Sequence, residues 1–578
     1  MPQSRRRKPT LQGPPFWRLV SVAVVLVLSA GAVLLRALDL QVINSEFLRS
    51  EADARHLRTV SMPAPRGVVQ DRHGEPLAVS SPAQSAWAEP AELLADPDAL
   101  RAVAEALDRS PQALESFLEQ RADREFVYLR RHLPPPLAAE LEGLEAPGLH
   151  MLQESRRFYP AGEVAAQLVG ITDIDGQGLA GAERAFNDAL SGQSGAKRVV
   201  RDRFGRTIDS VELLREPRPG EDIQLTIDRR IQYLAYRELK RAVRRHGASS
   251  GSAVVLDARS GEILALVNQP SYNPHRRSGV EDEQRRNRAA GYAMEPGSVI
   301  KPFTVAAALQ SGAVGREQIL DTAPGTMQVS GHEVRDLLDY GDLDVAGVLQ
   351  KSSNVGAAKV ALETEPRALW STLEDFGFGE RTRSGLREEH AGHFLAAPPR
   401  GDVQRATLSY GYGITATPLQ LARAYAALAN DGVLLPLSIR HGGEPPRGHR
   451  VLDADLAADL RGMLEKVTEP GGTGTRADIT GYRIAGKTGT VRKSGAEGGY
   501  AEDDYIANFI GFAPASDPRL VIAVSVDEPQ GELFYGGQVA APVFASIMAG
   551  ALRMLNVPPD DDVPVPDLPV LAEREDSP

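Results

Sequence analysis

Residues 19–35 form a run of seventeen positions without a charge, and this run constrains the chain more than any other feature. A helix over it would be about 25 Å long, enough to cross a thin hydrocarbon core. Residues 5–8 and Arg18, which precede it, are all basic, whereas Asp39, Glu46 and Glu51 follow it. By the positive-inside rule, we expect a transmembrane helix over residues 19–36, with residues 1–18 in the cytoplasm and the rest outside.

A cleaved signal peptide is the alternative interpretation of this segment. Ala30, Gly31 and Ala32 resemble a small-residue cleavage site after an apolar stretch. The apolar run continues past that site through Val33 and Leu34, which favours a retained anchor over cleavage.

Cysteine is absent from the 578 residues, and the net charge is −12. The missing thiols exclude disulfide frameworks, thiolate metal sites and cysteine nucleophiles, so covalent catalysis would have to use Ser, Thr, Lys or a carboxylate. The acidic balance argues against nucleic acid as a partner. The length is sufficient for several packed domains.

Composition divides the part beyond the anchor into three segments. Residues 37–216 mix helical and extended patterns, and we interpret the charges in the Gly- and Arg-rich stretch 156–216 as a solvated surface or a partner face. Pro217, Pro219 and Gly220 mark a boundary, after which residues 217–555 form a second domain. Residues 556–578 are rich in Pro and Asp, and we expect them to be disordered.

The second domain has its expected strands near its two ends and helices between them. A helix is predicted over 229–243, and strands over 252–256 and 263–267 form a hairpin around the turn at Gly261. Further strands are predicted over 508–513 and 520–526. A sheet assembled from such distant pieces indicates an α+β fold.

A Ser-x-x-Lys pattern occurs twice, at Ser194–Lys197 and at Ser298–Lys301. The first lies in a Gly- and Ser-rich turn with no helix behind it. The second opens a helical run, 299–309, so that its hydroxyl and amine share one face of a first helical turn. On this motif alone, a simple helix start remains the plainer interpretation of Ser298.

Two further motifs follow Ser298 in the chain. Ser352-Ser353-Asn354 precedes an expected helix over 355–362, although the similar Ser271-Tyr272-Asn273 shows how common such a pattern is. Lys487-Thr488-Gly489 occurs once, after an expected strand over 482–485, and its Gly permits a close backbone approach. The order and spacing of the three motifs raise them above chance.

With these motifs the chain resembles the penicillin-recognising serine acyltransferases. Further segments that resemble class B penicillin-binding proteins of the division-specific type are Arg66-Gly67, Asp71-Arg72, Arg157 to Pro160, Tyr410 to Gly413, Thr417-Pro418 and Tyr535 to Gly537. The resemblance covers about residues 15–560. It implies an N-terminal transmembrane helix, an elongated mixed α/β pedestal of the dimerisation type, and a transpeptidase domain like the serine β-lactamases, with a central antiparallel sheet between helices.

The resemblance also implies a reaction, in which Ser298 is acylated by a D-Ala-D-Ala stem peptide and a second stem peptide resolves the acyl-enzyme into a cross-link. Lys301 would take the Ser298 proton, since burial, the helix and Lys487 all lower the pKa of its amine. Ser352 and Asn354 would relay the proton and hold the peptide, and the backbone amides of Ser298 and Thr490 would form an oxyanion hole. The remaining binding residues would be Thr488, Gly489 and Thr490 for the terminal carboxylate, and Tyr410 and Tyr535, with Tyr412 and Phe534, as cleft or core aromatics.

The expected setting is the division septum of the inner membrane, with the catalytic domain in the periplasm. Stem peptides and β-lactams are the implied ligands, and the glycosyltransferase FtsW and other divisome membrane proteins are the implied partners. We expect no metal and no cofactor. Two alternatives are a β-lactamase or carboxypeptidase, which lacks support because no Glu-x-x-x-Asn base follows Ser298, and a non-catalytic antibiotic sensor or assembly scaffold.

Overall fold

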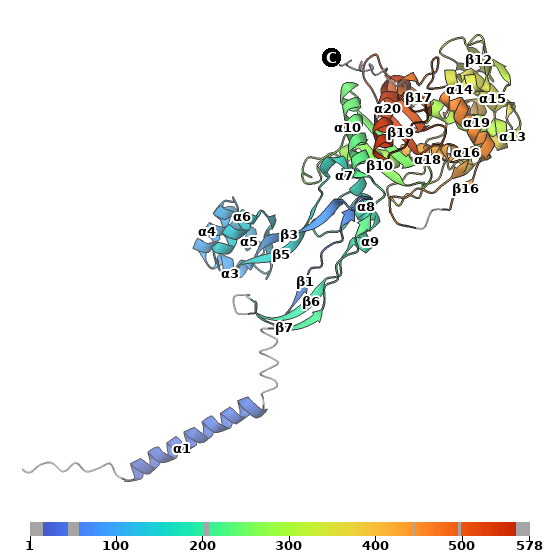
Figure 1. Ribbon diagram of the computed structural model, residues 1–578. Coiled ribbons are helices and arrows are strands. Elements are labelled where there is room, and N and C mark those ends of the chain that lie inside the picture. The colour runs from blue at the N-terminus through green and yellow to red at the C-terminus, as the bar shows by residue number, and fades with distance from the viewer. Residues whose placement is uncertain (1–15, 44–56, 202–206, 444–446, 495–498, 562–578) are drawn as a thin grey trace, which may run out of the picture. The chain divides into compact units, whose positions relative to one another are not determined.

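The computed structural model of the chain describes residues 16–43, 57–201, 207–443, 447–494 and 499–561 (Figure 1). It separates into two compact units. The first comprises residues 1–64, 85–152 and 193–218, and the second comprises residues 65–84, 153–192 and 219–578. Segments 65–84 and 153–192, which the sequence assigned to the pedestal, thus pack with the second unit, and the expected boundary near 217 stays a prediction.

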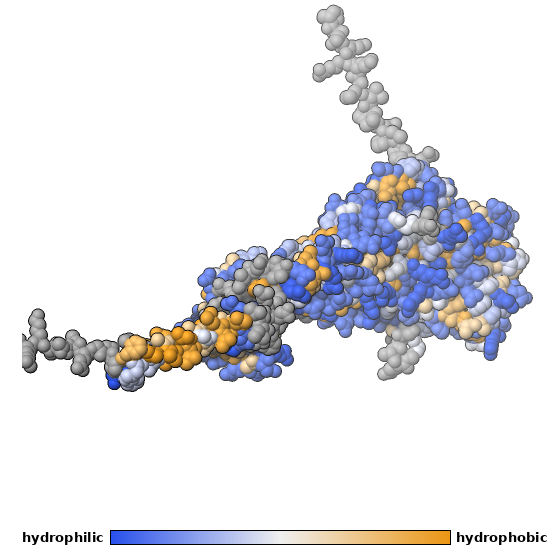
Figure 2. All heavy atoms as spheres, turned by 90° about the horizontal axis from the view of Figure 1, so that it is seen from below, coloured by the Kyte–Doolittle hydropathy of each residue, from blue (hydrophilic) through white to orange (hydrophobic). Residues whose placement is uncertain are grey.

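The apolar run forms helix α1 (Phe16–Leu38), continued by a π-helical turn η1 (Asp39–Ile43). The helix begins three residues before the expected span, because Phe16, Trp17 and Arg18 join it. It is long and apolar enough to cross a membrane, and its side chains form the orange stretch beside the grey N-terminal residues in Figure 2. The expected cytoplasmic residues 1–15 lie outside the described residues.

Short capped helices gather in the first unit: α3 (Pro90–Leu94), α4 (Pro97–Ala106), α5 (Pro111–Glu119) and α6 (Pro135–Gly143). Each has Pro at its start, where a missing N–H costs no hydrogen bond. The Asp96 carboxylate caps α4 and the Ser110 hydroxyl caps α5. Buried Leu and Ala side chains from these helices form one cluster with β4 (Val127–Leu133).

A three-stranded antiparallel sheet completes the first unit, with the order β1 (Leu57–Met62), β6 (Gly195–Arg201), β7 (Thr207–Arg215). Ser194 directly precedes β6, and Lys197 lies within it, opposite Val60. The first Ser-x-x-Lys pattern therefore has no helix behind it, as the sequence indicated.

Five antiparallel strands form the centre of the second unit, in the order β10 (Ile263–Gln269), β9 (Ser250–Asp257), β19 (Leu520–Asp527), β18 (Tyr500–Ala513), β17 (Ala485–Ser494). The predicted hairpin and the two predicted late strands are confirmed, each with extended ends. Strands from the two ends of the domain meet where β9 pairs with β19.

Helices cover both faces of this sheet (Figure 1). On one face, Val255 and Ile522 pack with α10 (Arg229–Arg245) and α20 (Gly536–Met554). On the other face, Val254 and Val521 join a second core with α18 (Pro418–Ala429). Burial on both faces explains why these strands are continuous apolar runs. The expected antiparallel sheet between helices is confirmed.

The remaining elements connect these parts of the chain. In the segments before the sheet they are β2 (Val69–Gln70), β3 (Pro76–Ala88), β5 (Leu149–Phe158), η2 (Gly162–Val164), α7 (Ala166–Val169), α8 (Gly181–Ala185), α9 (Asn187–Leu190) and β8 (Ile223–Gln224). Between β10 and β17 they are α11 (Asp282–Arg285), α12 (Arg288–Gly291), η3 (Gly297–Ile300), α13 (Lys301–Ser311), β11 (Ile319–Asp321), β12 (Thr326–Val329), β13 (His332–Arg335), β14 (Asp342–Asp344), α14 (Val345–Lys351), α15 (Asn354–Glu363), α16 (Pro366–Asp375), α17 (Asp402–Ser409), β15 (Val433–Leu434), β16 (His449–Arg450), α19 (Ala454–Glu465) and η4 (Thr475–Ala477).

A buried ion cluster corrects, for Arg157 and Glu183, the interpretation of the charges in 156–216 as a solvated surface or a partner face, whereas others such as Glu212 are exposed. Glu183 has no exposed surface, and its carboxylate accepts from Arg66 Nε at 2.7 Å and from Arg157 Nε at 2.6 Å. Arg66 also donates to Ser191 Oγ at 2.9 Å. The charges compensate one another inside the unit, which composition alone could not reveal.

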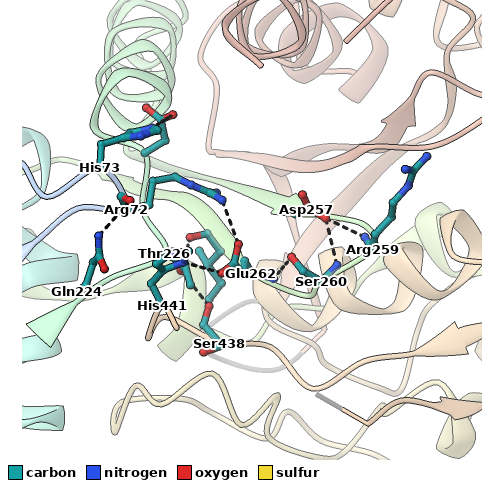
Figure 3. A network of polar contacts seen from close by, with 12 residues as sticks. Arg72, His73, Gln224, Thr226, Asp257, Arg259, Ser260, Glu262, Ser438 and His441 are labelled. Atoms are coloured by element: carbon teal, nitrogen blue, oxygen red, sulfur yellow. Dashed lines mark hydrogen bonds and ion pairs between the residues drawn. The ribbon is translucent and has the colours of Figure 1, made fainter. Parts of the chain in front are cut away.

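A second polar network joins the β2–β3 turn to the loops beside β10 (Figure 3). Arg72 Nη2 lies 3.2 Å from Glu262 Oε2, and His441 Nδ1 lies 3.0 Å from the other oxygen of that carboxylate. Gln224 Nε2 donates to the Arg72 carbonyl at 3.1 Å. The Asp71-Arg72 segment noted in the sequence is thus part of the framework of the second unit.

The first residues of the expected disordered tail are ordered. Tyr482 Oη donates to the Val557 carbonyl at 2.7 Å, and the Asp560 carboxylate accepts from Arg483 N at 2.8 Å and from Ser516 Oγ at 2.7 Å. Val557 also packs against the core that α10 and α20 share, so hydrogen bonds and one apolar contact together hold these residues. Residues 562–578 lie outside the described residues.

Candidate active site

Ser298 lies in the 3₁₀ turn η3, directly before α13, which begins at Lys301. The sequence predicted helix from Val299 on, and the first turn is instead the tighter form, in which positions i and i+3 are aligned. The turn packs closely on Gly411, because Gly297 N donates to the Gly411 carbonyl at 3.3 Å. Ser298 is partly buried, and its hydroxyl forms no hydrogen bond within the described part of the chain.

Lys301 is fully buried at the start of α13. Its Nζ donates to the Ser352 carbonyl at 2.6 Å and to Asn354 Oδ1 at 2.8 Å, and lies 3.3 Å from Ser352 Oγ. Burial disfavours the charged amine and lowers its pKa to about 7, while the Asp336 carboxylate acts in the opposite direction. At neutral pH, a large fraction of Lys301 is therefore an uncharged base.

Ser352 lies between the two lysines of the motifs. Its Oγ accepts from Lys487 Nζ at 2.8 Å and is the same atom that lies 3.3 Å from Lys301 Nζ. Ser352 ends α14 with φ 59° and ψ 37°, a left-handed conformation that costs a non-Gly residue about 1–3 kcal/mol. This backbone conformation brings both the carbonyl oxygen and the hydroxyl of Ser352 within reach of Lys301 Nζ.

Asn354 is held by a carboxylate that the sequence analysis missed. Its backbone N–H donates to Asp336, and its side-chain amide donates to the Arg335 carbonyl at 2.9 Å. Ser353 caps α15 by accepting from Gly356 N at 2.8 Å, and its hydroxyl donates to Asp336 Oδ2 at 2.5 Å. No motif marks Asp336, because its partners lie 17 to 19 residues further along the chain.

Lys487 is in the edge strand β17, opposite Ile510 of β18. The strand predicted over 482–485 is wrong in position: β17 begins at Ala485, after a turn at Gly481, and contains the whole motif. Lys487 is fully buried, and its pKa is lowered by burial first and by Lys301 second. The two amines share Ser352, so they disfavour each other's charge.

Gly489 allows β17 to approach the turn that carries Ser298. A Cβ at this position would lie 2.9 Å from Val299 Cγ1 and 3.3 Å from the Pro296 carbonyl oxygen. The hydroxyls on either side of it have partners. Thr488 Oγ1 lies 2.7 Å from Thr473 Oγ1, a residue that carried no sequence signal, and Thr490 Oγ1 accepts from Gly536 N at 3.0 Å.

The two candidate aromatic residues differ in their surroundings. Tyr410 is 8% exposed and belongs to a small core cluster with Val355 and Ala406, so packing accounts for most of its surface. Its ring meets Tyr412 edge-on, with centroids 5.7 Å apart. Tyr535 is 40% exposed beside Phe534, at the start of α20.

One carboxylate–imidazole group with metal-like spacing occurs among the described residues. Ligand atoms of Glu89, Glu92 and His150, in the first unit, lie within 4.8 Å of one another. None of these residues belongs to the three motifs, and the expected absence of a metal stays a prediction.

The geometry brings Lys301, Ser352, Asn354 and Lys487 into one hydrogen-bonded cluster, with Ser298 three residues before Lys301. A buried amine with a pKa near neutrality can accept a hydroxyl proton. A neutral amine donates two N–H bonds, here to the Ser352 carbonyl and to Asn354, and keeps one lone pair for that proton. The arrangement can therefore activate a hydroxyl nucleophile and move a proton away from it.

Comparisons with known proteins agree with this architecture. Residues 251–549 match the family described as penicillin binding protein transpeptidase domain, and residues 61–225 match the penicillin-binding protein dimerisation domain. The chain is 42% identical to peptidoglycan D,D-transpeptidase FtsI of Escherichia coli K12, covering 94% of this chain and 93% of that protein. It is 43% identical to the probable peptidoglycan D,D-transpeptidase PenA of Neisseria meningitidis serogroup A, covering 93% and 92%.

Solved structures give the same result. The transpeptidase domain of Burkholderia pseudomallei penicillin-binding protein 3 is 41% identical, with a TM-score of 0.54 over 58% of this chain and 98% of that one. Penicillin-binding protein 3 of Mycobacterium tuberculosis, complexed with aztreonam, is 30% identical, with a TM-score of 0.67 over 87% of this chain and 99% of that one.

Proposed function

The chain belongs to the class B penicillin-binding proteins, with the FtsI-type peptidoglycan D,D-transpeptidases as relatives, and from that premise we propose that it cross-links stem peptides through an acyl-enzyme on Ser298. Ser298 Oγ attacks the carbonyl carbon of the penultimate D-Ala, and the terminal D-Ala leaves as a free amine. The amine of a second stem peptide then attacks the ester carbonyl and releases the Ser298 hydroxyl. A β-lactam enters the same first step and leaves Ser298 acylated.

Lys301 is the base of the first step in this proposal. Its neutral amine takes the Ser298 proton as the bond to the carbonyl carbon forms. The proton then passes through the Ser352 hydroxyl, which lies 3.3 Å from Lys301 Nζ and 2.8 Å from Lys487 Nζ, to the leaving amine. Asn354 keeps Lys301 oriented and holds the substrate amide.

The developing negative charge requires donors at the carbonyl oxygen. We assign this role to the backbone amides of Ser298 and Thr490, on the two segments that Gly489 allows to approach. Such donors contribute about 10²–10³ each in rate. Thr488, Gly489 and Thr490 of β17, beside Lys487, form the binding surface for the terminal carboxylate, and exposed Tyr535 borders it.

The observation that carries the proposal is the shared contact of two fully buried lysine amines with one serine hydroxyl. Burying two like charges side by side is costly unless at least one is neutral. A purely structural hydrogen bond could be made by any two polar side chains. A general base and a proton relay instead need an amine of lowered pKa next to a hydroxyl, which Lys301 and Ser352 provide.

The setting of the reaction is part of the proposal. Helix α1 anchors the chain in the inner membrane, with the N-terminus in the cytoplasm and the residues that follow the helix in the periplasm. The division septum, FtsW and other divisome membrane proteins follow from the family as the place and partners of this activity. Protease accessibility of the two termini in intact spheroplasts tests the topology.

A fluorescent penicillin tests the nucleophile. The full chain in detergent should be labelled covalently, and Ser298→Ala should abolish the label, because the other hydroxyl beside Lys301, that of Ser352, is engaged by Lys487 Nζ at 2.8 Å and serves as the relay in this proposal. Ser194→Ala is the matched control, since it removes a hydroxyl from the other Ser-x-x-Lys pattern, and it should label as wild type. Label retained by Ser298→Ala would move the nucleophile elsewhere.

A further inference from the structure

The Asp336 carboxylate binds three consecutive residues: Ser353 and Asn354 of the second motif, and Val355 directly after it. It is 9% exposed, and it accepts from Ser353 Oγ at 2.5 Å, from Val355 N at 3.1 Å and from Asn354 N. A carboxylate that accepts three hydrogen bonds from one turn fixes that turn more firmly than backbone bonds alone, since bonds to a charged acceptor are the stronger ones.

The turn that Asp336 fixes supplies all the hydrogen-bond partners that Lys301 Nζ has among the described residues. These are the Ser352 carbonyl, the Ser352 hydroxyl and Asn354 Oδ1. Ser352 itself has a left-handed backbone, which an unconstrained serine seldom adopts. Its conformation depends on neighbours that are held in place, and Asp336 holds the next three residues.

Asp336 also acts on Lys301 through its charge. Burial lowers the pKa of Lys301, and the negative charge of the Asp336 carboxylate raises it in part. Lys487, on the opposite side of Ser352, is the other charged group in this cluster.

The other charged residues on the elements packed against α13 are engaged elsewhere or exposed. Lys351 of α14 donates to the Gly471 carbonyl, Lys359 of α15 to the Asp321 carbonyl, and Glu363 accepts from Gln318. On α16 the charged residues Arg367, Glu374 and Asp375 are exposed. On α19 three charged residues form ion pairs away from Lys301: Asp459 with Arg316, Arg461 with Asp431, and Glu465 with Arg483. Asp455 of α19 forms no ion pair within the described residues.

We propose that Asp336 is a positioning residue of the acyl transfer: it holds the Ser352–Asn354 turn against Lys301, and its negative charge makes Lys301 a stronger base. This inference rests on the proposed function, in which Lys301 takes the Ser298 proton. The two roles have separate effects on acylation. Holding the turn sets the acylation rate at high pH, and the negative charge sets the pH below which that rate falls.

Asp336→Asn separates these effects. The amide is isosteric: its oxygen can still accept from Asn354 N and Val355 N, and its NH₂ can donate to Ser353 Oγ. The charge is lost and the direction of the Ser353 bond is reversed, while both backbone bonds of the turn are kept. The rate constant of acylation by a chromogenic β-lactam, measured on the full chain in detergent between pH 5 and pH 9, should keep its high-pH plateau, and the acid limb should move to lower pH by about one pH unit.

Two variants complete the test. Ser353→Ala keeps the charge and removes two bonds, the one from Ser353 Oγ to Asp336 and the α15 cap bond from Gly356 N, so the plateau should fall about tenfold while the acid limb stays near pH 7, the pKa of Lys301. Asp339→Asn removes a carboxylate from the exposed loop three residues further on and should change neither. Thermal unfolding of each variant shows that the fold is retained.

The outcomes distinguish this inference from the proposed function. An unmoved acid limb in Asp336→Asn overturns the electrostatic role, and a plateau in Ser353→Ala equal to wild type overturns the positioning role, even when Ser298→Ala has lost its label. Label retained by Ser298→Ala overturns the proposed function itself, and this inference with it.

Discussion

Gly489 shows how closely β17 approaches the turn that carries Ser298. The nearest atoms to a Cβ at this position would be Val299 Cγ1 at 2.9 Å, the Pro296 carbonyl at 3.3 Å and Asn508 Cβ at 3.4 Å. Two of these three belong to the segment around Ser298. A glycine is therefore required here for close approach, not for an unusual backbone angle.

Gly489→Ala should slow acylation by a β-lactam by a factor of about 10–100, because a methyl group would separate β17 from η3 and displace the oxyanion donors. The acylation rate constant measures this directly. Gly462→Ala is the control: it lies in the exposed part of α19 with no atom within 4 Å of a new Cβ, and it should leave the rate unchanged. Equal acylation rates in the two variants would show that the close approach of β17 to η3 is not needed for acylation.

Residues of the site were predictable where they are neighbours in the chain. Ser298 and Lys301, or Ser352 and Asn354, are local patterns with a fixed spacing, and their order along the chain distinguishes them from chance copies. Asp336 and Thr473 carry no local pattern, because each acts on a residue that only the fold brings near. The contact of both lysines with one hydroxyl also needed coordinates.

At the level of elements, hydrophobic runs located the strands of the central sheet, but they could not locate β17. Its sequence contains Gly, Lys and Thr rather than a continuous apolar run, because it is an edge strand that faces a polar site. The periodic apolar segment just before it, around Tyr482, belongs instead to a turn packed on the core. An edge strand with a polar function therefore lacks the pattern on which strand prediction depends.

The buried cluster of Glu183 with Arg66 and Arg157 gives a prediction about stability. Glu183→Gln leaves two guanidinium groups buried without their counter-charge, and it should lower the free energy of unfolding by about 3–5 kcal/mol. Urea unfolding followed by tryptophan fluorescence checks this. Glu212→Gln, whose side chain is 54% exposed and pairs with Arg198, should cost at most about 1 kcal/mol. Similar losses in both would show that burial does not distinguish the two sites.

On the scale of the whole molecule, the sequence predicted an anchor, a first region of mixed structure and an α+β catalytic domain, and the fold agrees with each. The chain does not divide at a single point, however. Segments 65–84 and 153–192 belong to the second unit: Arg66 pairs with Glu183 between the two segments, and Arg72 pairs with Glu262 in the rest of that unit. Composition varies along the chain, but it does not show which distant segments pack into the same core.

The position of the covalent bond is the central claim. The full chain, incubated with a β-lactam, quenched in acid and digested with pepsin, should carry the drug mass on one peptide, and fragmentation by mass spectrometry should place it on Ser298. A thioester analogue of the D-Ala-D-Ala stem should acylate the same atom. An adduct on any other residue, or turnover of the analogue without an adduct on Ser298 at any time point, would contradict the account.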